Sequence, residues 1–177
     1  MPESVVPIDL AIEKRLAAAV ELFGESVVVR RAISLLAGNN EGDDFLLFVG
    51  GEHAQGILDG APVLYWPELW GTRALLYVWD DTAAEAVAAA IANQAWRVRE
   101  MGARVAAVRG LPLSGALVGL LADEVARVRG SAARALGDVG ALEDIDSIRA
   151  LLKDPDIDVR RGAQQGIDAL RKRFPVA

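Results

Sequence analysis

One short motif recurs at an almost constant interval along this 177-residue chain. The motif is an Asp or Asn followed, five and six residues later, by a Val-Arg pair. Its three copies begin at Asn93, Asp123 and Asp154, and their pairs are Val98-Arg99, Val128-Arg129 and Val159-Arg160. The copies are 30 and 31 residues apart. A period of this length is typical of proteins that stack similar supersecondary units, so the sequence predicts a repeat array.

The apolar residues of each copy follow the periodicity of an α-helix. After Val128 and Val159 they fall at i+4, i+7 or i+8 and i+11, and in the second case also at i+15, which places them on one helix face. These residues are Ala132, Ala135, Leu136 and Val139 in one copy and Ala163, Ile167, Leu170 and Phe174 in the next. The segment before each motif repeats as well, in the columns Val87, Leu117 and Ile148 and Ile91, Leu121 and Leu152. Each unit is therefore predicted to be a helix, a tight turn and a second helix, with stacked neighbours burying both apolar faces.

The predicted organisation is a single all-α domain over residues 1–177. Residues 80–177 contain the regular repeats, whereas residues 1–79 hold degenerate repeats and a capping helix near 10–23. The small residues Gly102, Ala132 and Ala163 recur at one position, where we expect adjacent second helices to approach closely.

The motif at 154–163, Asp-Pro-Asp-Ile-Asp-Val-Arg-Arg-Gly-Ala, resembles the HEAT-like repeat of bilin-lyase-type proteins. The copies at 123–132 and 93–102 are similar to it, and the resemblance extends over about residues 80–174. It implies a right-handed α-solenoid of about five helix-pair repeats, whose second helices line a concave face. It also implies a protein-binding scaffold, since most members of this family bind proteins and some assist the modification of a bound partner.

Composition excludes several kinds of site. The chain has no Cys and one His, which excludes disulfides, thiolate zinc sites and multi-histidine metal sites. The single imidazole, His53, has no Ser-His-Asp arrangement around it and is expected at a helix start. We therefore predict no catalytic residues, no metal and no cofactor. The N-terminus has no signal-peptide pattern and no apolar run approaches the ~20 residues of a spanning helix, so the prediction is a cytoplasmic protein with no membrane partner.

The recurring polar residues of the motif have two interpretations. Read functionally, Asn93, Asp123 and Asp154 with Arg99, Arg129 and Arg160 form an acid–base ladder. Read structurally, the Asx side chain caps the turn and the Arg binds neighbouring turns. Because these residues recur at the period of the fold, we favour the structural interpretation.

A second recurring set lies on the opposite helix face. Six residues after each anchoring Val come Arg104, Arg134 and Gln165, and two residues after it come Glu100, Gly130 and Arg161. We expect these residues to face a groove, where Arg is favoured in recognition, although a merely solvated face fits the same pattern. Trp66 and Trp70, in a cluster of four Trp between 66 and 96, are either further contact residues or bulky core residues.

The leading functional hypothesis is a non-enzymatic module that binds a protein partner on its concave face. The alternatives are nucleic-acid binding, as in HEAT-like glycosylases of alkylated bases, and a modification helper similar to bilin lyases. The chain has a net charge of −6, which disfavours binding to phosphate backbones. Residues 96–139 are nevertheless basic, with 7 basic and 4 acidic side chains, and this keeps nucleic acid as the second hypothesis.

Overall fold

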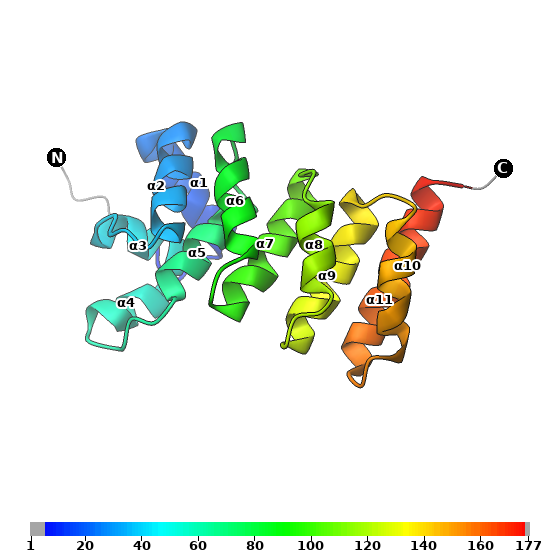
Figure 1. The fold of residues 1–177 in the computed structure, drawn as a ribbon. Coiled ribbons are helices and arrows are strands. Elements are labelled where there is room, and N and C mark those ends of the chain that lie inside the picture. The colour runs from blue at the N-terminus through cyan, green and yellow to red at the C-terminus, as the bar shows by residue number, and fades with distance from the viewer. Residues whose placement is uncertain (1–5, 176–177) are drawn as a thin grey trace. The chain divides into compact units, whose positions relative to one another are not determined.

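The computed structural model describes residues 6–175, and all regular secondary structure in this part of the chain is helical (Figure 1). It contains eleven α-helices and two short 3-10 helices, η1 and η2. The chain divides into two compact units after Ala86. The predicted all-α class is therefore confirmed, and each unit is described separately below.

Five α-helices and the 3-10 helix η1 lie within the first unit. These are α1 (Ile12–Phe23), α2 (Glu25–Leu36), α3 (Asp43–Gly50), α4 (Glu52–Leu58), α5 (Trp66–Ala74) and η1 (Asp81–Ala83). The core lies between α1, α2, α3 and α5, with Phe45, Phe48 and Leu35 almost fully buried. Gly24 joins α1 directly to α2 at a φ of 84°, a conformation that disfavours any residue with a Cβ.

A buried arginine stabilises the end of α3. The Arg15 guanidinium donates to the carbonyl oxygens of Phe48, at 2.9 Å, and Val49, at 3.4 Å. These are among the last carbonyls of α3, which have no partner within the helix. Burial, aided by the neighbouring charge of Arg73, lowers the pKa of Arg15. We assign Arg15 a structural role.

The second unit is a stack of helix pairs. Its helices are α6 (Ala84–Ile91, which spans the division between the units), α7 (Trp96–Arg109), α8 (Ser114–Leu120), α9 (Ala126–Val139), α10 (Asp144–Arg149), η2 (Ala150–Lys153) and α11 (Ile157–Arg173). The long second helices α7, α9 and α11 pack in succession, and α8 and α10 pack against them from one side (Figure 1). This is the α-solenoid arrangement that the period predicts.

The buried columns follow the predicted spacing with two exceptions. Val87, Leu117 and Ile148 are fully buried, as expected. The prediction for Leu152 is wrong, because this side chain is 37% exposed and Leu151 is buried in its place. The chain tightens there into the 3-10 helix η2, whose three residues per turn bring residue i+3 to the face that i+4 would occupy in an α-helix. Phe174 is also exposed, because α11 ends at Arg173.

The second helices α9 and α11 approach one another closely at glycines that were not among the predicted close-approach positions Gly102, Ala132 and Ala163. A Cβ on Gly166 of α11 would lie 2.1 Å from the Ala133 carbonyl oxygen of α9. A Cβ on Gly162 would lie 2.8 Å from the Gly130 carbonyl oxygen. Gly102 instead faces the preceding helix α6, where its Cβ would meet Ala90 at 3.1 Å. The close backbone contact of α9 with α11 therefore depends on glycines that the sequence did not predict as close-approach positions.

Candidate functional site

The turn between the two helices of each repeat is built by the recurring Asx residue. In all three copies its Oδ1 accepts a hydrogen bond from the backbone N–H two residues later, at 2.8–2.9 Å. The acceptors are Asn93, Asp123 and Asp154. An Asx side chain used in this way imitates a backbone turn and directs the chain into the second helix.

The recurring arginines tie each turn together and link it to the next. Arg99 donates to both carboxylate oxygens of Asp123, at 2.7 and 3.1 Å, and Arg129 contacts Asp154 in the same way at 2.8 and 3.0 Å. Each arginine also donates to two backbone carbonyls of its own turn, as does Arg160 in the last copy. The side chains of both ion pairs are at most 16% exposed. These six Asx and Arg residues, which we call the ladder, therefore all form hydrogen bonds that hold the turns of the repeats.

The ladder also shifts the pKa of its carboxylates. The hydrogen bond from Arg129 is the main reason that the pKa of Asp154 lies below its ordinary value. Burial alone would raise the pKa of Asp123, but hydrogen bonds from Arg99 and from the Val125 N–H, with the charges of Arg99 and Arg129, outweigh burial and lower it. Both carboxylates are stabilised in the charged form, which is the form that the inter-repeat ion pairs need.

A groove lies across α7, α9 and α11, on a different set of side chains. It consists of two cavities of about 400 and 330 Å³ that share Glu100 and Arg134. The first is completed by Ala126, Arg127, Gly130, Asp156 and Asp158, and the second by Arg104, Ala107, Val108, Ser131, Ala135 and Asp138. We call these residues together the α7–α9–α11 groove. Its lining combines small residues, Gly130 and three alanines, with seven charged side chains.

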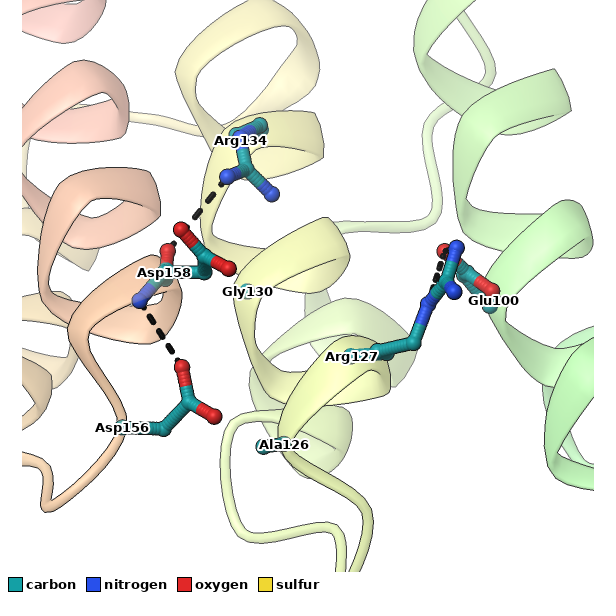
Figure 2. Close-up of a pocket in the computed structure, with 7 residues that line it drawn as sticks. All are labelled: Glu100, Ala126, Arg127, Gly130, Arg134, Asp156 and Asp158. Atoms are coloured by element: carbon teal, nitrogen blue, oxygen red, sulfur yellow. Dashed lines mark hydrogen bonds and ion pairs between the residues drawn. The ribbon is translucent and has the colours of Figure 1, made fainter.

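Two arginines of α9 extend from this helix toward its two neighbours, α7 and α11 (Figure 2). Arg127 reaches toward α7, where it forms an ion pair with Glu100 at 3.3 Å. Arg134 reaches toward α11, where it donates to the Asp158 carbonyl at 3.3 Å and to Gln165 Oε1 at 2.8 Å. Asp156 caps α11 by accepting a hydrogen bond from the Asp158 N–H at 2.8 Å, and it is also one of the residues that line the groove. Opposite charges therefore alternate along the groove.

Residues 83–168 match the family model of HEAT repeats. This part of the chain consists of HEAT repeats. The match begins in η1, runs through the pairs α6–α7 and α8–α9 and ends within α11. It therefore includes the three motif copies and all of the groove. Comparison with curated proteins gives no significant match.

The HEAT repeats bring together part of the predicted contact set. Glu100, Arg104 and Arg134 line the groove. Gln165 lies at its edge through its hydrogen bond to Arg134. Arg161 is outside the lining and forms an exposed ion pair with Asp158 at 3.3 Å.

The two predicted Trp contacts belong to the first unit, outside the HEAT match. The prediction of Trp70 as a contact residue is wrong, because the side chain is 3% exposed and packs over Gly50. Trp66 is half-buried and packs edge-on against Trp70, with ring centroids 5.7 Å apart. His53 is exposed at the second position of α4, where its ring lies 5.8 Å from that of Trp66.

Several groove residues escaped the motif comparison. Asp156 and Asp158 lie within the last motif copy but have no acidic equivalent in the other two copies. Arg127 has a counterpart, Arg97, which contacts the Trp96 ring at 4.3 Å. Arg97 and Arg127 both stand one residue before the anchoring Val, and this recurrence in the sequence could have identified Arg127 as a groove residue.

Among residues 6–175, no group of three or more His, Asp or Glu side chains is placed to hold a metal ion. No helix within these residues has the length and apolar character that crossing a bilayer requires.

Proposed function

We propose that this protein is a non-enzymatic binding module that holds a segment of a protein partner in the α7–α9–α11 groove. HEAT repeats commonly act as protein-interaction scaffolds, and the groove crosses three successive second helices of the array. An extended surface of this kind suits a polypeptide better than a small molecule.

The observation that carries the proposal is the alternation of charge in the groove. Three arginines and four carboxylates line it: Arg104, Arg127, Arg134, Glu100, Asp138, Asp156 and Asp158. A phosphate backbone would be repelled by the carboxylates, whereas a polypeptide with both charge signs has a partner for each wall. The groove thus favours protein over nucleic acid.

Two groove residues are available for contact without breaking the fold. Arg104 is exposed and makes no hydrogen bond or ion pair with any residue that the structure describes. Val108, one turn further along α7, is 63% exposed and offers apolar surface beside it. Arginine next to apolar surface is a common composition of binding hot spots. We assign Arg104, Val108 and Arg134 the main role in partner binding.

The test is an affinity capture from lysate of the source organism, with and without nuclease. The tagged full-length protein is compared with the Arg104→Glu/Arg134→Glu variant. The control is Arg149→Glu/Lys153→Glu, which reverses two exposed charges on α10 and η2, outside the groove. Circular dichroism first establishes that both variants keep the wild-type helix content.

We expect a stoichiometric protein that survives nuclease, is retained by the control and is lost from the groove variant. Capture that the groove variant retains would place the binding site elsewhere. Capture that nuclease abolishes would replace the protein partner by nucleic acid and would overturn the proposal.

A further inference from the structure

A separate cavity lies wholly within the first unit. Its volume is about 440 Å³, which is within the range of ligand and anchor pockets. Its apolar walls come from α2, α3, α4 and the segment before α5, and include Leu46, Ile57 and Leu58. The lining side chains Val63 and Leu64 are 59% and 64% exposed. The apolar surface therefore continues from the cavity onto the loop between α4 and α5.

The charged residues around this cavity are all acidic. Glu41, Asp43 and Glu68 line it, and no Lys or Arg does. Arg31, a nearby cation, is already paired with Glu41 at 3.4 Å and with Asp44 at 2.9 Å. Residues 1–86 carry 5 basic and 14 acidic side chains, a net charge of −9. A cation approaching this cavity is thus attracted both by the rim and by the whole unit.

The carboxylate of Glu68 has an oxygen atom that lacks a hydrogen-bond donor within the described part of the chain. Its Oε2 atom is buried and has no hydrogen-bond partner among the residues that the structure describes. The Thr72 hydroxyl, which is close by, donates to the Glu68 backbone carbonyl and not to the carboxylate. Buried carboxylate oxygens are rarely left without a donor, because desolvation is costly. An N–H donor from a bound molecule would satisfy this atom.

We propose that this cavity is a second protein-binding site, which takes a segment with an apolar anchor side chain beside a Lys or Arg. The anchor fills the space between Leu46 and Ile57, and the cation meets Asp43, Glu41 and Glu68. The exposed Val63 and Leu64 extend the contact beyond a single side chain, which favours a polypeptide over a small amine. Because every lining residue belongs to the first unit, this site is independent of the α7–α9–α11 groove.

The probe is a display library of random linear peptides, selected on the immobilised full-length protein. Peptides that also bind the Leu64→Lys variant are removed, and Leu142→Lys, which changes an exposed leucine outside the cavity, is the matched control. We expect the surviving peptides to carry an apolar residue close to Lys or Arg and a net positive charge. Survivors that are acidic or uncharged, or a library without survivors, would overturn the proposal.

Affinity of one surviving peptide is then measured by fluorescence anisotropy. Burying one apolar anchor corresponds to about tenfold or more in affinity, so Leu64→Lys should weaken binding by at least that factor. Asp43→Lys should weaken it about fivefold, whereas Glu25→Lys should change it less than about twofold. Asp43 and Glu25 are matched, since both are exposed and begin a helix of the same unit. Equal effects of the last two substitutions would show that only overall charge matters and would refute the assigned site.

Discussion

Replacing Arg129 by Met tests whether the ladder holds neighbouring HEAT repeats together. The side chain of Arg129 is 16% exposed and that of Asp154 is 6% exposed. The substitution removes two hydrogen bonds to the carboxylate, at 2.8 and 3.0 Å, and two to backbone carbonyls of the turn to which Arg129 itself belongs. Methionine keeps most of the apolar stem, so the change isolates the guanidinium.

The expected loss follows from this geometry. A hydrogen bond to a charged group contributes about 1.5–3 kcal/mol, and removing one partner of a buried ion pair costs about 3–5 kcal/mol. Asp154 keeps its hydrogen bond from the Asp156 N–H and the nearby charge of Arg160, which places the loss near the lower limit. We expect the free energy of unfolding to fall by about 3 kcal/mol.

Urea denaturation followed by far-ultraviolet circular dichroism measures this loss. The control is Arg149→Met, because Arg149 forms an exposed i,i+3 pair with Asp146 at 2.6 Å. Exposed pairs of this kind contribute about 0.5 kcal/mol or less. If Arg129→Met destabilised the protein no more than the control does, the ladder would not be a major source of stability.

Three further outcomes are expected. Asp154→Asn should cost less than Asp154→Ala in the same urea assay, because an amide Oδ1 keeps the turn that Asn93 forms in the first copy at 2.8 Å; equal losses would contradict this. The pKa values of Asp123 and Asp154 lie below those of the unfolded chain, so their contribution is present above pH about 4 and is lost as the pH falls below it. The Asp123→Asn/Asp154→Asn variant should therefore lose less of its stability on acidification than the wild type, as urea titrations at several pH values would show. Gly166→Ala should cost about 2 kcal/mol or more by overpacking α9 against α11, whereas Gly119→Ala, which meets open space, should be neutral or stabilising by about 0.5 kcal/mol; thermal unfolding compares the two.

The regular repeats were predictable because one physical demand recurs at every turn. In all three motif copies an Asx side chain caps the turn between the two helices and an arginine donates to the carbonyls of that turn, so the period and the recurring residues indicate the fold. The apolar columns follow for the same reason, and they fail only at Leu152 and Phe174, where the helix tightens or ends. Local backbone changes of this kind leave no trace in a 3.6-residue pattern.

The groove was only partly predictable. Helical spacing placed Arg104 and Arg134 on one face, but Asp156 and Asp158 reach the groove from the start of α11, where the motif copies differ. The glycine contacts between α9 and α11 depend on how two helices cross, which a single-helix pattern does not encode. Similarly, no period extends into the first unit, so the burial of Trp70 and the acidic cavity follow only from tertiary packing.

Site-specific photo-crosslinking tests most directly whether a protein segment occupies the α7–α9–α11 groove. A photoreactive amino acid replaces Val108, which lines the groove, and in a second protein replaces Leu142, which is 42% exposed outside it. After irradiation in cells of the source organism, mass spectrometry identifies the adducts. We predict one polypeptide adduct from position 108 that is absent from position 142. The same adduct from both positions, or a nucleic-acid adduct from position 108, would contradict the claim.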